Sequence, residues 1–396
     1  MRLSSKLITA ALGAFAYWPG SYAWAAAGHE IVATIAQIYL HPNVLPILCN
    51  ILDLRGDKCH MASVATWADE NRKQMLWSGA MHFVNALEDN PPSTCAFPGP
   101  SGWAGKQGSN VLDGIKNTTH LLQKWVNHDE SDIVANEALK FLIHFLGDMH
   151  QPLHLTGKHR GGNCVAVLFE EQETTLHILW DHFLVARAIR TTSSNYSRPL
   201  PLREVEDALR GSTYDPFIRR IVSEGLLGVW ADDLKTWFSC PAPNTASKDI
   251  VSDVTSSSGL LSMFQSAYRF TSRITRGLVN VGVEINPDGP IVCPYYWAQP
   301  LHELNCELVW PKELESLPYN QPQFESNSAV SSECEKTPPL DLDVSKYADV
   351  IERDMVVEKL LAQGGIRLAG LLNYIFANKS QPTLPITWSD DFEEAM

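Results

Sequence analysis

Apolar residues recur every three or four positions along most of the chain, a spacing that predicts amphipathic helices. The segment HEIVATIAQIYL at 29–40 has this pattern, and so do six further stretches. A proline follows the stretch at 133–150, at Pro152, and a glycine pair interrupts the last one, at Gly364 and Gly365. We therefore expect helices over residues 29–40, 63–75, 111–128, 133–150, 176–188, 216–238 and 345–377, the last broken or kinked at its two glycines.

Little of the chain has the alternating pattern of a β-strand. The segment NCVAVLF at 163–169, entered through Gly161 and Gly162, is the best strand candidate. Residues 240–260 and 311–343 are rich in serine, proline or acids and lack any apolar period, so both read as surface insertions. The fold class expected is mainly α, with a single large helical domain over 24–396, a short β-hairpin or strand element and surface loop insertions.

The N-terminus has the pattern of an export signal. Arg2 and Lys6 precede an apolar run at 7–17, and small residues precede Ala23, where a signal peptidase would cut. Residues 1–23 would then be removed and Trp24 would become the first residue. The alternative is a buried N-terminal helix. The run is too short to cross a bilayer, and we expect a secreted protein without a membrane partner.

Cysteine and sequon content fits the same compartment. Eight cysteines in an exported chain allow up to four disulfides, and none forms a C-x-x-C pair of the kind that binds zinc. Sequons begin at Asn117, Asn195 and Asn378, so glycosylation is expected.

Charge limits the kind of substrate contact. The chain of 396 residues is 45% hydrophobic and 19% charged, and its net charge of −14 becomes −16 when residues 1–23, with two basic and no acidic residues, are removed. Such a surface repels duplex nucleic acid in general. If the substrate is an anion, the positive charge must be supplied locally, and a bound metal ion would supply it.

The segment HFLGDMHQPLH at 144–154 interleaves histidines and an aspartate with apolar residues. His144 and Asp148 are four apart and share one helix face. Pro152 ends the helix, which allows His154 to turn back toward the same point. His150 lies on the opposite face, so we do not expect it to be a ligand.

The same chemistry recurs elsewhere. His177 and Asp181 repeat the four-residue spacing, and His29, Asp69 and His82 lie within apolar segments. A single such histidine is more often a satisfied core residue, and a single pair fits an intrahelical ion pair. Together, however, these imidazoles and carboxylates form the donor set that zinc prefers. Burying them without a hydrogen-bond or metal partner would also cost folding free energy.

Six motifs, in this order, carry a family resemblance: WAAAGHE, TWADENR, HFVN, HFLGDMHQPLH, RGGN and LHILWD. The set closely resembles the zinc-dependent, single-strand-specific nucleases of fungi and plants (the S1/P1 type), within the superfamily of zinc phospholipases C and nucleases. The resemblance implies a helical fold that holds three zinc ions. It also implies a disulfide between Cys95 and Cys306 and leaves the other cysteines unassigned.

Carried over by position, the resemblance implies three ligand sets. The first ion would be held by Asp69, His82, His144 and Asp148. The second would be held by the free α-amino group and carbonyl oxygen of Trp24, with His29 and a bridging Asp148. The third would be held by His154, His177 and Asp181. Trp24 would alternatively be only a hydrophobic anchor, and Ala25 replaces a glycine that is frequent in the family.

The resemblance also implies roles in catalysis and recognition. Asp69 would orient the nucleophile, and Arg72 would stabilise the transition state, unless Arg72 is only a surface charge. Phe83 would stack on a base and Asn85, where relatives often have aspartate, would bind the base edge. Alternatively, Phe83 is only a buried residue of the hydrophobic core. Thr175 replaces an asparagine of the family.

The expected activity is therefore hydrolysis of phosphodiester bonds in single-stranded DNA and RNA to 5′-phosphate products, with accompanying hydrolysis of 3′-nucleotides. Base stacking requires unpaired bases and tolerates any of them, so sequence specificity should be weak. Two alternatives remain: a zinc-dependent phospholipase C, and a catalytically inactive secreted zinc-binding protein. No motif implies a protein partner.

Overall fold

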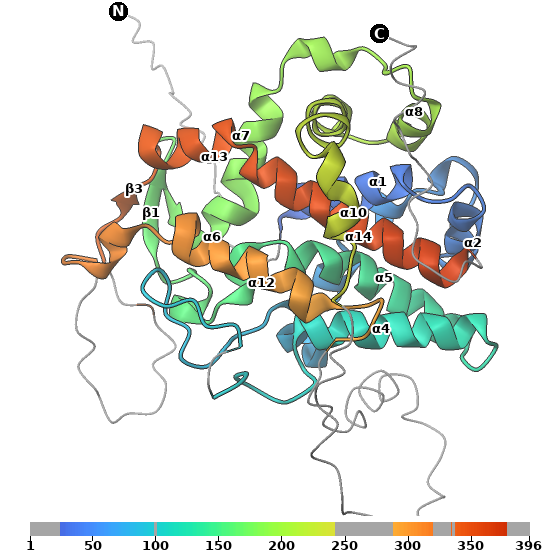
Figure 1. The fold of residues 1–396 in the computed structure, drawn as a ribbon, viewed down its shortest axis with the longest axis horizontal. Helices are drawn as coiled ribbons and strands as arrows, with labels where there is room; N and C mark the ends of the chain where they lie inside the picture. The colour runs from blue at the N-terminus through green and yellow to red at the C-terminus, as the bar shows by residue number, and fades with distance from the viewer. Residues whose placement is uncertain (1–23, 99–100, 242–287, 320–333, 335–336, 378–396) are drawn as a thin grey trace, which may run out of the picture.

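The computed structural model describes residues 24–98, 101–241, 288–319, 334 and 337–377. These residues form a mainly α structure with one small sheet, as predicted (Figure 1). None of the described helices is both long and apolar enough to span a bilayer.

Five longer helices build the core of the described structure. They are α1 (Ala26–Ile38), α4 (Val111–Val126), α5 (Asp132–Met149), α12 (Pro294–Leu304) and α14 (Val356–Phe376). Helices α4 and α5 lie side by side, and α14 packs on both α1 and α5 (Figure 1). The side chains of Asn110 and Ser131 cap α4 and α5 by accepting hydrogen bonds from backbone N–H groups of the first turn.

Shorter helices connect these elements. The α-helical ones are α2 (Val44–Ile51), α3 (Trp67–Glu70), α6 (Leu176–Ile178), α7 (Leu184–Thr191), α8 (Arg203–Leu209), α9 (Asp215–Arg220), α10 (Leu234–Trp237) and α13 (Val350–Arg353). The 3₁₀ turns include η2 (Met61–Val64), η3 (Leu76–His82), η4 (Pro152–Leu155) and η11 (Lys312–Glu315), and wider π-helical segments include η6 (Leu179–Phe183), η8 (Ile221–Val229), η10 (Asn305–Val309) and η12 (Ser345–Asp349).

The sheet has three strands in the order β2-β1-β3. Strand β1 (Ala166–Phe169) lies within the predicted strand 163–169 and forms an antiparallel hairpin with β2 (Gln172–Thr175), which lies beyond it. Strand β3 (Leu340–Asp341) pairs parallel to β1. Thr175 ends the hairpin and caps α6, because its hydroxyl accepts a hydrogen bond from the N–H of Ile178. The hairpin thus leads directly into the helix that carries His177.

Three sequence-based helix predictions need correction. Residues 63–75 form only η2 and the one-turn α3, and residues 216–238 are divided among α9, η8, α10 and a connecting turn. The break expected at Gly364 and Gly365 is also wrong. The chain breaks at Met355, whose φ of 48° is left-handed, and α14 continues through both glycines.

The two glycines serve helix packing instead. A Cβ on Gly365 would lie 2.5 Å from Cγ2 of Ile35 and 3.1 Å from the carbonyl oxygen of Val32, both on α1. A Cβ on Gly364 would meet the side chain of Val32 at 3.3 Å. The glycines therefore let α14 approach α1 more closely than any larger residue would allow.

Gly365→Ala should lower the free energy of unfolding by about 2 kcal/mol, because the added methyl overpacks the α1–α14 contact. Gly364→Ala is the matched control. Its smaller clash is offset by the better helix propensity of alanine, worth about 1 kcal/mol. Urea denaturation of both variants measures the difference. Equal stabilities would show that close approach of α1 is not what Gly365 provides.

Three of the four disulfides among the described cysteines join residues at least 53 positions apart, and the fourth spans 10. The predicted pair Cys95–Cys306 is confirmed, and the pairs that the sequence left unassigned are Cys49–Cys59, Cys164–Cys334 and Cys240–Cys293. Cys334 and β3 both lie within 311–343. Cys334 is bonded to Cys164 just before β1, and β3 pairs with β1, so this part of the region is attached to the sheet. Residues 1–23 and 242–260 lie outside the described residues.

The two sequons within the described residues differ in access. Asn117 is buried within α4, and the hydroxyls of Thr118 and Thr119 bond to carbonyls of their own helix. Asn195 is exposed in a short 3₁₀ turn. Asn378 lies outside the described residues.

Protein secreted from a eukaryotic host should therefore carry a glycan at Asn195 and none at Asn117, because a glycan at Asn117 would prevent α4 from packing. Peptide mass spectrometry with Asn195→Gln as the control checks this. A glycan on Asn117 of folded protein would contradict the burial of that side chain.

Candidate metal centre

The C-terminal end of α5 forms the centre of the site. His144 and Asp148 lie one turn apart on this helix, and both are completely buried. Pro152 then begins η4, which carries His154. Gly147 has no room for a side chain, because a Cβ there would lie 2.5 Å from Nδ1 of His29. The lack of a side chain at Gly147, between His144 and Asp148, thus leaves room for His29 of α1.

The first donor group has four members. Nδ1 of His82 lies 3.0 Å from Oδ2 of Asp148 and 3.1 Å from Nε2 of His144. Oδ1 of Asp69 lies 3.6 Å from each of these two nitrogens, and Nε2 of His144 lies 3.3 Å from Oδ2 of Asp148. Ligands about 2.05 Å from a tetrahedral zinc ion are separated by about 3.4 Å. The five distances cluster around that value.

The second group shares Asp148 with the first. The other carboxylate oxygen, Oδ1, lies 3.5 Å from Nε2 of His29 and 3.6 Å from Nδ1 of His154. The indole of Trp24 is fully buried, and the N–H of Ala25 donates to the carbonyl oxygen of Asp181 at 3.0 Å. The backbone at Trp24 is therefore held next to a residue of the third group.

The third group joins η4 to the helix after the hairpin. Nε2 of His177 lies 3.1 Å from Oδ2 of Asp181, and Nε2 of His154 lies 3.9 Å from Oδ1 of the same carboxylate. The rings of His154 and His177 are stacked, with centroids 5.1 Å apart. All three side chains are buried. Eight of the nine sequence-predicted ligand residues thus bring their side chains together in three linked groups, and the backbone beside the ninth, Trp24, is bonded to Asp181.

Backbone carbonyls fix how three of these histidines are presented. Nδ1 of His144 lies 2.8 Å from the carbonyl oxygen of Ala65. Nδ1 of His154 lies 2.7 Å from the carbonyl oxygen of His82, and Nδ1 of His177 lies 2.7 Å from that of Gly161. A carbonyl accepts only, so Nδ1 carries a proton, and in the neutral ring that binds a metal ion Nε2 presents a lone pair to the site. This is the usual arrangement around metal-binding histidines.

Several buried polar atoms in these groups have no hydrogen-bond partner among the described residues. They are both ring nitrogens of His29, Oδ1 of Asp69, Nε2 of His82, Oδ1 of Asp148 and Nε2 of His154. Leaving buried polar atoms unpaired is unfavourable, and most buried polar groups are satisfied. Four of these atoms, Nε2 of His29, Oδ1 of Asp69, Oδ1 of Asp148 and Nε2 of His154, lie within the three groups and can offer lone pairs there, so the residues present fit bound divalent cations.

Without metal, the charge of each side chain in these groups is set by its burial and by the charges of its neighbours. Burial lowers the pKa of His29 to about 3, aided by His144. Burial also acts to lower the pKa of His144, but the carboxylates of Asp148 and Asp69 outweigh it and raise that pKa to about 9. The neighbouring histidines overcome the burial effect on Asp69 and Asp148 and hold both pKa values below the usual range. Both acids are therefore ionised and ready to bind a cation.

The other predicted site residues follow donor residues in the chain. Arg72 follows α3 one turn beyond Asp69 and is half-buried beside Gly79. Phe83 and Asn85 are half-buried in the strand-like segment after His82, where Asn85 packs against Gly157.

Two further residues lie close by without joining the donor groups. His150, predicted not to be a ligand, points away and contacts Leu146 and Arg367. Asn163 donates to the carbonyl oxygen of Arg160 and so fixes the loop before β1.

Sequence reasoning missed two supports of the third group. Nε2 of Gln151 donates to Oδ1 of Asp181 at 2.6 Å, and Gly161, with a φ of 63°, presents its carbonyl to His177. A Cβ on Gly161 would lie 2.6 Å from the carbonyl oxygen of Leu153. The double glycine of RGGN was the available signal for the second support, whereas Gln151 had none.

Known proteins share this organisation. A model of the S1/P1 nuclease family matches residues 24–377. The chain is similar to Endonuclease 3 of Arabidopsis thaliana, with 27% identity over 370 residues that cover 91% of each chain. It is 36% identical to Nuclease P1 of Penicillium citrinum over 170 residues, which cover 42% of this chain and 60% of the relative. It is 37% identical to Nuclease S1 of Aspergillus oryzae over 167 residues, which cover 41% of this chain and 54% of the relative.

The family match spans the whole described structure and every donor residue of the three groups. Nucleases hydrolyse phosphodiester bonds, and the buried, ionised carboxylates and lone-pair-presenting imidazoles suit metal-assisted hydrolysis of such bonds. The chain therefore belongs to the S1/P1 nuclease family and is a hydrolase that acts on nucleic acid.

Proposed function

We propose that this nuclease is a secreted endonuclease that holds three zinc ions and cleaves single-stranded DNA and RNA to leave 5′-phosphate ends. The observation that carries the proposal is the arrangement of three buried donor groups: the first two share Asp148, and His154 of the third lies 3.6 Å from the same carboxylate. Nitrogen and carboxylate donors in buried, preformed sets favour zinc over calcium or magnesium.

Zinc ions bound in these groups would lower the pKa of a water molecule and offset the negative charge of the phosphate. The protein contributes the arrangement. Asp69, with Oδ1 facing the first group, would orient the attacking water in line with phosphorus. Arg72, one turn further along, would donate to the phosphate oxygens as charge increases on them.

Substrate choice would come from Phe83 and Asn85. Phe83 immediately follows His82, so a base stacked on its ring would place the adjacent phosphate near the first group. Stacking contributes about 1–3 kcal/mol per base and requires an unpaired base. Asn85 would bind the base edge as both donor and acceptor, which suits weak base preference.

The export proposal is supported by four disulfides among the described cysteines and by the N-terminal pattern. In this proposal residues 24–396 form one domain, and cleavage before Trp24 completes the second donor group by freeing its amine.

One preparation of mature protein tests the activity. We expect phosphate esters to be cleaved in single-stranded DNA and RNA, with much slower cleavage of duplex DNA and none of phosphatidylcholine. Faster release of phosphocholine than of nucleotides would identify the phospholipase alternative. Hydrolysis of neither substrate by zinc-loaded protein would favour the inactive zinc-binding alternative.

The proposed 3′-nucleotidase activity has a separate test. A stacked base and a terminal 3′-phosphate would reach the same groups, whereas a 5′-phosphate would not. We expect 3′-AMP to be hydrolysed and 5′-AMP to resist. Equal rates on the two nucleotides would argue against recognition through Phe83.

A further inference from the structure

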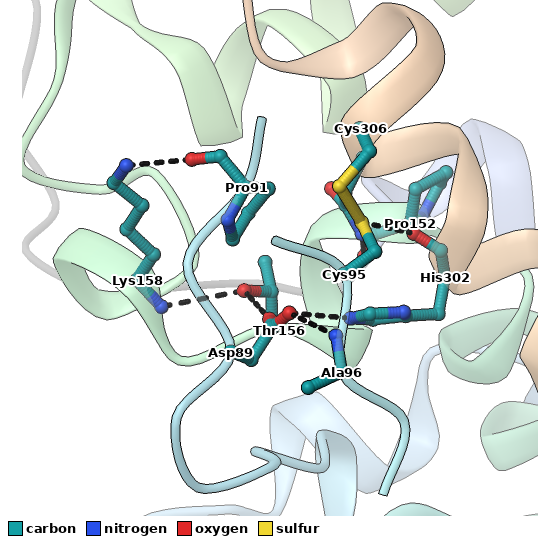
Figure 2. The surroundings of a disulfide bond; sticks show 10 residues. Asp89, Pro91, Cys95, Ala96, Pro152, Thr156, Lys158, His302 and Cys306 are labelled. Atoms are coloured by element: carbon teal, nitrogen blue, oxygen red, sulfur yellow. Dashed lines mark hydrogen bonds and ion pairs between the residues drawn. A yellow bond between two sulfur atoms is a disulfide. The ribbon is translucent and has the colours of Figure 1, made fainter. Parts of the chain in front are cut away.

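A second buried carboxylate–imidazole contact lies outside the three donor groups. Figure 2 shows Asp89 facing His302, with Nε2 of the imidazole 3.1 Å from Oδ1 of the acid and both side chains fully buried. The backbone N–H of Ala96 donates to the same oxygen at 3.1 Å. The hydroxyl of Thr156 donates to Oδ2 at 2.5 Å. Phe97 stacks on the imidazole at 4.7 Å.

This cluster is not arranged as another metal site. The nearest additional donor is Cys95, and its sulfur is bonded to Cys306. Asp89 already uses both carboxylate oxygens for protein contacts. A cation here would have at most two side-chain ligands and would displace existing partners. The contacts of Asp89 therefore indicate a structural role, which depends on the segment that they hold in place.

The contacts hold the turn that carries His154. Thr156 lies two residues after His154, and Pro152 lies two residues before it. At the Pro152 end of the turn, the side-chain amide of Asn305 donates to the carbonyl oxygen of Pro152 at 2.8 Å. The side chain of Asp89 and that of Asn305, the first residue of η10, thus fix the two ends of η4.

The disulfide joins the two supports. Cys95 adjoins Ala96, whose N–H bonds to Asp89, and Cys306 adjoins Asn305. Figure 2 shows the bond between the loop and the helix, beside Pro152 and His302. The supports of η4 are therefore covalently linked to each other as well as hydrogen-bonded to the turn.

We propose that Asp89, Thr156, His302 and Asn305 form a brace that positions His154 for the third donor group. The inference rests on the proposed function, because it assigns the brace to the ion held by His154, His177 and Asp181. Residues that orient a metal ligand typically affect metal affinity by about 10–100-fold. Loss of the brace should weaken one ion and leave the other two in place.

Thr156→Val tests the brace, because it keeps the shape of the side chain and removes the hydroxyl. Thr156→Ser restores the hydroxyl and should restore the wild-type behaviour. Thr118→Val is the matched control, since Thr118 is equally buried but its hydroxyl bonds only to its own helix. Asn305→Leu removes the support at the opposite end of η4.

The first readout is zinc content during titration with a chelator. In Thr156→Val and Asn305→Leu, one of three zinc equivalents should be lost at about tenfold lower chelator concentration. The remaining two should leave as in wild type. Thr118→Val and Thr156→Ser should match wild type throughout. Wild-type retention of all three equivalents by both brace variants would overturn the inference, and so would simultaneous loss of all three.

The second readout is amide hydrogen exchange of metal-free protein. Peptides over 150–158 should exchange at least about tenfold faster in Thr156→Val than in wild type, with α4 unchanged. Unchanged exchange in these peptides would overturn the brace. If wild-type protein binds no third ion, the proposed function fails instead, and exchange alone decides whether the brace exists.

Discussion

Asp148→Asn should reduce turnover on single-stranded DNA by more than about 100-fold. Asp148 is completely buried, and its two oxygens face different donor groups, Oδ2 toward His82 and His144 and Oδ1 toward His29 and His154. An amide of the same size replaces one of these oxygens with a nitrogen that cannot ligate, and it removes the negative charge. One substitution therefore weakens two groups at once.

Asp129→Asn is the control for this prediction. Asp129 is exposed in the connection between α4 and α5, so its substitution makes the same change of charge far from the donor groups. Zinc content, turnover and the unfolding midpoint should be measured on both variants. Retention of more than a few per cent of wild-type turnover by folded Asp148→Asn would contradict the shared role of this carboxylate.

A single extra residue before Trp24 should remove about one zinc equivalent and lower turnover by more than about 100-fold. In the proposed second group, the amine of Trp24 donates its lone pair, and a peptide nitrogen cannot do so because its lone pair is delocalised. The burial of Trp24 and the hydrogen bond from Ala25 to Asp181 keep this part of the backbone beside the third group.

The matched control adds the same residue after Met396 and should change neither zinc content nor turnover. If Trp24 is only a hydrophobic anchor, the N-terminal extension should cost some stability and leave the zinc content at its wild-type value. That result would remove the amine from the ligand set and leave the first and third groups intact.

The sequence predicts those parts of the site whose residues are spaced one helical turn apart. The pairs His144–Asp148 and His177–Asp181 each lie within one helical turn, so the period of the helix is enough to bring them together. The family resemblance then adds the distant members, Trp24, His29, Asp69 and His82. Without it, the sequence would give no reason to join α1 and α3 to the end of α5.

Other features depend on long-range contacts that leave no local pattern. The break at Met355 and the continuous helix through Gly365 reflect the close approach of α1, which a scan of α14 alone does not show. The contact of Asp89 with His302 joins residues more than 200 positions apart, between a loop and a helix. Such contacts are set by tertiary packing, so sequence periodicity does not predict them.

Metal analysis of the mature secreted protein, combined with sequencing of its N-terminus, tests the central claim most directly. The donor groups predict three zinc ions per chain in protein that begins at Trp24. Correctly folded, active protein that contains no zinc would contradict the claim that these buried imidazoles and carboxylates form a metal centre.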